Sequence, residues 1–116
     1  MWLLSLCACA SDLGRTLERI ERQVASAPDS AYTALCAIDK SRLSDKGDKA
    51  LYKLLMSEAM YKLYMEEDND SIITLVCQYY KTRPDKQRFM RALFMKAIIE
   101  YYGHEYPQSL ITAREA

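Results

Sequence analysis

One eight-residue segment occurs twice in this chain, and the repeat restricts its possible folds more than any other feature. Residues 29–36 and 70–77 align without a gap about 41 residues apart, with Asp, Ser, Thr and Cys at matching positions. A shorter third copy, residues 109–112, repeats residues 71–74 about 38 residues later. Periods of about 34 to 47 residues are typical of helical-hairpin repeats. The sequence therefore predicts an all-α fold, a right-handed stack of about three hairpins.

The composition agrees with a helical domain. Half of the 116 residues are apolar, 28% are charged, and only three are Gly and three Pro. A chain of this length can bury one small core, and its composition disfavours both a turn-rich β fold and disorder. Sixteen basic and sixteen acidic residues give zero formal charge. Since long-range attraction to nucleic acid needs a basic surplus, we expect no nucleic-acid partner.

Apolar spacing, caps and prolines predict about six helices, beginning near residues 11, 28, 45, 70, 85 and 106. In the first of these helices Ser11 is the expected N-cap, and the apolar positions recur at helical spacing. Pro28, Pro84 and Pro107 each stand where a helix can begin. The expected core positions of the first helix and of the connector after residue 39 are Leu13, Leu17, Ile20, Val24 and Leu43.

Aligning the hairpins predicts which residues share an environment. Ala59 and Ala97 take the same position and should both be buried where helices cross closely. Cys36 and Cys77 are also equivalent, and buried free thiols are expected there, with a disulfide as the alternative. The helix after residue 70 should bury one apolar set, which is Ile72, Leu75, Val76, Tyr79 and Tyr80.

The N-terminus differs in kind from the rest of the chain. Residues 1–9 are almost wholly apolar and end in Leu6, Cys7, Ala8 and Cys9, which resembles a bacterial lipobox. This pattern predicts a signal remnant over residues 1–10, a lipid on Cys9 and a helical-repeat domain over residues 11–116. A signal also needs a basic n-region, so the true start would lie upstream. The alternative is an apolar tail that packs on the first helix.

Several motifs resemble those of known repeat proteins. Residues 104–110 are similar to the Gly-Asp-Tyr-x-x-Ala-Leu turn of tetratricopeptide repeats, with Tyr106 as the aromatic plug and Ser109 as the small contact. Residues 22–80, with the Pro-Asp-Ser-Ala segment that begins at Pro28, resemble the N-terminal part of tetratricopeptide lipoproteins from gut Bacteroidetes. The resemblance implies a tetratricopeptide-like solenoid in a lipid-anchored protein of the cell envelope.

The same resemblance implies a non-enzymatic protein-protein interaction module with a protein or peptide partner. No apolar stretch approaches the roughly 20 residues of a membrane span, so membrane contact is expected only through the lipid anchor. The alternative is a sensory or scaffolding fragment of a membrane-associated transcription regulator. Without lipidation, the same fold would be expected in the cytoplasm.

Residues that carry chemistry are sparse. His104 is the only histidine, and its expected turn position suits capping or solvation better than catalysis. Residues 66–70 are acidic but lack the glycine and closing glutamate of a calcium loop. Cys7 and Cys9 lack the spacing of a zinc site. We therefore predict no catalytic residues, no metal site and no cofactor.

Two groups of surface residues are candidates for binding. Nine tyrosines are more than one small core requires, and their amphipathic rings suit peptide contact, although packing is the alternative. The candidate tyrosines are Tyr52, Tyr61, Tyr64, Tyr101 and Tyr102. A basic segment lacks a recognition motif, so we expect a solvated face in preference to a phosphate site. Its members are Lys81, Arg83, Lys86, Arg88 and Arg91.

Overall fold

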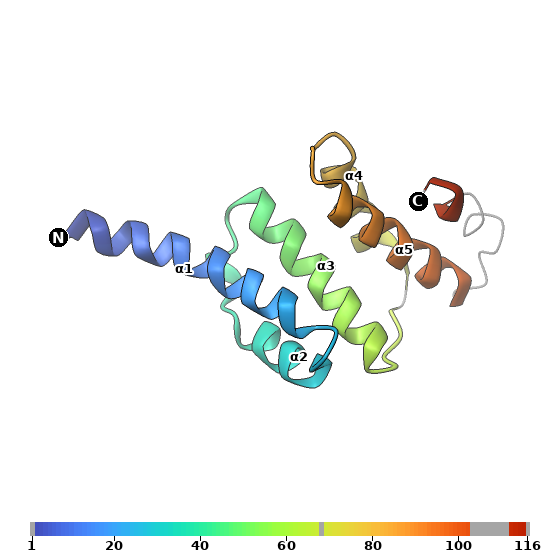
Figure 1. Ribbon diagram of the computed structural model, residues 1–116, viewed down its shortest axis with the longest axis horizontal. Helices are drawn as coiled ribbons and strands as arrows, with labels where there is room; N and C mark the ends of the chain where they lie inside the picture. Colours follow the sequence, from blue (N-terminus) through green and yellow to red (C-terminus); the bar gives the residue numbers. More distant parts are fainter. Residues whose placement is uncertain (1, 68, 103–111, 116) are drawn as a thin grey trace.

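A computed structural model describes residues 2–67, 69–102 and 112–115, and these form helices joined by short connections (Figure 1). The all-α prediction is confirmed, and no strand occurs in the described ranges. Residues 112–115 form one further helical turn. The helices are α1 (Trp2–Gln23), α2 (Pro28–Ala37), the 3-10 helix η1 (Lys40–Arg42), α3 (Lys46–Lys62), α4 (Ser71–Lys81) and α5 (Lys86–Tyr102).

The helices pack as successive hairpins around α3. Helix α3 contacts both α1 and α2, and α5 contacts both α3 and α4. Helices α3 and α5 thus each lie against both members of the helix pair before them, an arrangement that buries apolar faces between successive pairs. The molecule is elongated, with principal extents of 55 × 31 × 23 Å. Figure 1 shows α3 between the α1–α2 pair and the α4–α5 pair.

Local chemistry fixes most helix starts within a residue of the predictions. Pro28 occupies the first turn of α2, where its missing N–H costs nothing. The Asp45 carboxylate accepts a hydrogen bond from the backbone N–H of Asp48 at 3.1 Å and caps α3. The Asp85 carboxylate accepts one from the N–H of Arg88 at 3.2 Å, just before α5. Such caps satisfy donors that have no partner inside the helix.

The first helix corrects one prediction. Helix α1 begins at Trp2 and continues without interruption through Ser11, so Ser11 is not an N-cap. The apolar segment is therefore part of α1. In Figure 1 the N-terminal half of α1 projects away from the other helices. The buried positions described on α1 begin at Leu13.

Two apolar clusters make up the core, and α3 contributes to both. The first core joins α1, α2 and α3 through residues such as Leu17, Leu35 and Leu55. The second joins α3, α4 and α5 through residues such as Leu54 and Leu93. All five predicted core positions of α1 and the connector are buried: Leu13, Leu17, Ile20, Val24 and Leu43.

Of the apolar set expected on α4, Val76 and Tyr80 are buried as predicted, but the other three positions are not. Ile72 and Leu75 are 49% and 56% exposed, and Tyr79 is half-buried. The buried row is Ile73, Val76, Cys77 and Tyr80. The cause is packing, because α4 lies against both α3 and α5, whereas the equivalent helix α2 lies against α1 and α3. Matching sequence therefore does not give matching orientation.

The two repeated cysteines show the consequence of this rotation. Cys77 is buried as predicted, but Cys36 is exposed, so the expectation of an equivalent buried thiol is wrong for Cys36. Both are free thiols, which removes the disulfide alternative in this structure. Burial raises the pKa of the Cys77 thiol to about 11. Since the thiolate is the reactive form, Cys77 is an inert core residue.

The alignment of α3 with α5 holds in part. Leu54 and Leu55 are buried, as are their counterparts Ala92 and Leu93. Ala59 is fully buried, whereas Ala97 is only half-buried. The prediction of equal burial is therefore wrong for Ala97.

This difference leads to a test. Ala59→Leu should lower the free energy of unfolding by about 1 to 3 kcal/mol, because added methylenes at a closed contact force neighbouring side chains out of their rotamers. Ala97→Leu, at a half-buried position, is the matched control and should cost less. Urea unfolding of both variants measures the two effects. Equal losses would contradict the packing difference described here.

Several predictions lie outside the described residues. These concern His104, Tyr106, Pro107, Ser109 and the start of the last helix. Thr112 is described and buried. Its hydroxyl donates to Glu100 at 2.8 Å, and Lys96 donates to the same hydroxyl at 3.2 Å and to Glu100 at 2.7 Å. These bonds hold residues 112–115 against α5.

Candidate binding surfaces

A hollow of about 390 Å³ lies where the C-terminal ends of α3 and α5 meet. We call it the tyrosine hollow, because three of the candidate tyrosines line it. Tyr64 is 96% exposed, Tyr102 is 62% exposed and Tyr61 is 39% exposed. The remaining lining residues are Ser57, Met65, Glu66, Glu67, Met95, Ile98 and Ile99. Aromatic and thioether side chains around a hollow suit the binding of apolar groups.

Tyr64 adopts an unusual backbone conformation beside this hollow. Its φ is 59°, and it is the one described non-glycine residue with a positive φ. The N–H of Met65 donates to the carbonyl of Met60 at 2.8 Å and the N–H of Leu63 to that of Ala59 at 3.0 Å, which closes the end of α3 in a turn that usually contains glycine. A side chain in this region costs about 1 to 2 kcal/mol. Because Tyr64 is almost fully exposed, burial of its ring does not offset this cost.

Replacing this tyrosine should reveal the strain. Tyr64→Gly is expected to raise the free energy of unfolding by about 1 kcal/mol, since glycine adopts positive φ without a steric penalty. Tyr64→Ala removes the same ring but keeps the Cβ, so it should not stabilise the fold. Chemical denaturation distinguishes the two variants. If alanine stabilises as much as glycine, the ring and not the backbone is the source of the effect.

The aromatic surface continues around α5 beyond the hollow. Phe94, 56% exposed, packs edge-on against Tyr61 with ring centroids 6.5 Å apart. Tyr101 packs edge-on against Tyr102 at 5.6 Å. Four of the five candidate tyrosines thus lie on one connected surface. Sequence reasoning missed Phe94 and Met65, because helical spacing alone assigns them equally well to a core.

Tyr52 does not belong to that surface. It is 7% exposed and packs in the first core, so its prediction as part of an exposed binding face is corrected. Its hydroxyl oxygen is buried and has no hydrogen-bond partner among the described residues. Burial raises the pKa of Tyr52, with smaller contributions from Cys36 and Tyr32. A buried hydroxyl without a hydrogen-bond partner lowers the stability of the fold.

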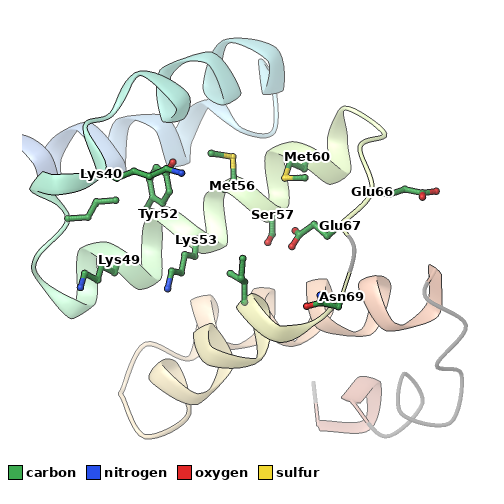
Figure 2. Close-up of a pocket in the computed structure, with 12 residues that line it drawn as sticks. Lys40, Lys49, Tyr52, Lys53, Met56, Ser57, Met60, Glu66, Glu67 and Asn69 are labelled. Carbon is green, nitrogen blue, oxygen red and sulfur yellow. The ribbon is translucent and has the colours of Figure 1, made fainter.

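The Tyr52 side chain lines a second and larger depression of about 600 Å³, which runs along α3 between η1 and α4 (Figure 2). We call it the lysine groove, because Lys40, Lys49 and Lys53 line it. It meets the tyrosine hollow at Ser57 and the loop residues Glu66 and Glu67, which line both. Its other lining residues are Leu43, Met56, Met60, Asn69 and Ile72.

The solvated-face prediction for the basic segment is confirmed for Lys81, Arg83 and Lys86, which are exposed, but is wrong for Arg88 and Arg91. Arg88 donates two hydrogen bonds to Glu21 of α1, at 3.0 and 2.8 Å, and one to Asp85 at 3.0 Å. Arg91 donates to Glu21 at 2.8 Å and to Glu58 of α3 at 2.9 and 2.6 Å. We call Glu21, Glu58, Arg88 and Arg91 the arginine network. It joins α1, α3 and α5, so these two arginines are unavailable to phosphate.

The charges of the network hold one another in the ionised state. Burial alone would raise the pKa of Glu21, but the hydrogen bonds and charges of Arg88 and Arg91 outweigh it, so the pKa lies below its ordinary value. The hydrogen bonds that Arg91 donates to Glu58 and Glu21 likewise raise the pKa of Arg91. Arg83, from the same basic segment, lies 3.7 Å from the centroid of the Tyr79 ring.

Other kinds of site were sought in the described ranges. Among these residues no three His, Cys, Asp or Glu side chains come together as metal ligands would. The helices of the described chain are too short or too polar to span a bilayer. Comparison with protein-family models, curated proteins and solved structures gives no significant match.

Proposed function

We propose that the protein is a non-enzymatic protein-interaction module whose tyrosine hollow binds an apolar segment of a protein partner. The observation that carries the proposal is Tyr64, which combines a strained backbone with an almost fully exposed ring. Folding gains nothing from that ring, and such strain concentrates at functional sites. Tyr61, Tyr102 and Met65 add further exposed apolar surface around it. Buried aromatic anchors dominate the energy of most protein interfaces.

A peptide library displayed on phage tests this proposal. We expect the protein to select peptides rich in aromatic and large aliphatic residues. Tyr64→Gly should lose most of this binding while remaining folded and gaining stability, a combination that a merely structural residue would not give. Leu75→Ser is the matched control, because Leu75 is 56% exposed but does not line the hollow. Selection that is unaffected by Tyr64→Gly would overturn the proposal.

We also propose that the module is held at the cell envelope by a lipid on Cys9. The lipobox-like order of residues 6–9 supports this. A lipid there would place the repeat stack at a membrane surface without involving either binding surface.

Expression with the natural upstream region in a Gram-negative host tests the anchor. The mature N-terminal mass should correspond to a lipidated Cys9, and the protein should partition with membranes. Cys9→Ala should abolish both properties. An unprocessed product that stays out of the membrane fraction with either residue would overturn the envelope proposal and leave the interaction module unaffected.

A further inference from the structure

We infer that the lysine groove is a second peptide site, which takes an extended segment with acidic residues at one end, apolar residues in the middle and a basic residue at the other. The inference rests on the proposed function in that it assumes a peptide partner, but its lysines and Tyr52 do not line the tyrosine hollow. The groove runs along α3 and shares only Ser57, Glu66 and Glu67 with that hollow (Figure 2).

The charges are separated along the groove. Lys40, Lys49 and Lys53 line one end, and none of them forms an ion pair with a carboxylate of the described residues. Glu66 and Glu67 line the other end. Figure 2 shows Lys49 and Lys53 on the side of α3 that faces α4, and Glu67 pointing back toward Ser57. A ligand with opposite charges at its two ends would pair with both.

Two buried polar atoms in the groove need partners that the described residues do not supply. They are the hydroxyl oxygen of Tyr52 and one carboxylate oxygen of Glu67. Tyr52 as a whole is only 7% exposed. Unpaired buried polar groups are rare, because each gives up its hydrogen bonds to water without a replacement. A peptide can satisfy both types of atom, since its carboxylates and carbonyls accept hydrogen bonds and its N–H groups donate them. The groove also has apolar lining residues, which are Leu43, Met56 and Ile72, and Figure 2 shows Met56 between the lysines and the glutamates.

The spacing fits an extended peptide. Lys49 and Lys53 are one helical turn apart, which separates them by about 6 Å. Alternate residues of an extended strand lie about 6.6 Å apart on one side. Two acidic residues separated by one residue would therefore face the two lysines. From Lys49 to Met60 the helix rises by about 16 Å, the length of about five extended residues.

A nucleic acid would also be attracted to lysines, but the observations favour a peptide. The floor of the groove is apolar, and the glutamates at its far end would repel a polyanion. The Tyr52 ring is buried and cannot stack on a base.

Fluorescence anisotropy with a labelled hexapeptide tests the inference. The probe is Asp-Leu-Asp-Leu-Leu-Arg, blocked at both ends, and we expect binding that weakens with added salt. Lys49→Gln combined with Lys53→Gln should weaken binding about tenfold, because charge-assisted bonds are lost. Lys81→Gln combined with Lys86→Gln makes the same change in net charge at exposed positions on another part of the surface. That control should leave the affinity within about twofold.

Tyr52→Phe adds a readout that a structural role would not give. It should weaken peptide binding while leaving the stability of the unliganded protein equal or higher, because it removes a buried hydroxyl without a partner. A probe with Asn in place of both Asp residues should bind as weakly as the double lysine variant. Equal binding of the two probes, an unaffected double lysine variant, or tighter binding of a twelve-nucleotide oligothymidine would each overturn the inference.

The outcome separates this inference from the proposed function. If the hexapeptide does not bind but peptides selected on the tyrosine hollow do, only the lysine groove is excluded as a site. If neither class of peptide binds, the proposed interaction function fails as well.

Discussion

Leu54→Ala and Leu55→Ala are each expected to lower the free energy of unfolding by about 2 to 5 kcal/mol, and to act on opposite halves of the molecule. Both side chains are fully buried, so truncation loses their transfer free energy and leaves a cavity that neighbours fill only in part. Leu55 belongs to the first core with α1 and α2, and Leu54 to the second with α4 and α5. Two adjacent residues of one helix therefore support different neighbours.

Amide hydrogen exchange under native conditions resolves the two effects. Leu55→Ala should speed exchange mainly in α1 and α2, and Leu54→Ala mainly in α4 and α5, because stacked repeats open in units linked only through their interfaces. Lys62→Ala, exposed near the end of the same helix, is the control and should change neither half. A uniform rise in exchange from both leucine variants would show that the two cores unfold as one cooperative unit.

The helix positions were predictable because they depend on local chemistry. Pro28, Asp45 and Asp85 act within one turn of the chain, through a fixed φ or a hydrogen bond to a nearby N–H. The repeat also correctly indicated an all-helical fold in which successive helices pack against one another. Helix orientation was less predictable. Whether Ile72 or Ile73 is buried depends on where α5 lies, and the sequence of α4 does not contain that information.

The candidate binding surface was predictable by residue type but not by position. An excess of tyrosine indicated exposed aromatic rings, and four of the five candidates lie on one surface. Nothing in the sequence distinguished the buried Tyr52 from the four exposed candidate tyrosines, because buried and exposed tyrosines can have the same helical spacing. The positive φ of Tyr64 was also hidden, since the sequence has no glycine at that turn to mark it.

The arginine network illustrates the same limit for polar residues. Arg88 and Glu21 are 67 positions apart, and Arg91 and Glu21 are 70 apart. Their charges resembled a solvated face in sequence, because each alternates with apolar residues as exposed charges do. Only the stacking of α5 beside α3 and near α1 brings them together. The network is therefore a product of the fold and a sensitive test of it.

Arg91→Met is expected to lower the free energy of unfolding by about 2 to 4 kcal/mol, because it leaves the Glu58 carboxylate partly buried without its charge partner. Methionine preserves most of the side-chain volume, so the loss reports the charge and not a cavity. Adding Glu58→Met should recover much of the stability, since replacing both partners of such a pair with apolar residues is often neutral. Urea unfolding of the single and double variants provides the measurement.

The pH dependence supplies an independent check on the same network. The lowered pKa of Glu21 means that, between its folded and unfolded values, the unfolded chain binds more protons than the native one. The contribution of Glu21 to the free energy of unfolding is therefore fully present at pH values above its ordinary pKa of 4.5. It is lost as the pH falls through the lower pKa that Glu21 has in the folded protein. Glu21→Gln should flatten this part of the stability curve, whereas Glu18→Gln, exposed on the same helix, should not. If both variants keep the parent's acid dependence, the ion pairs between α1 and α5 contribute nothing to the fold.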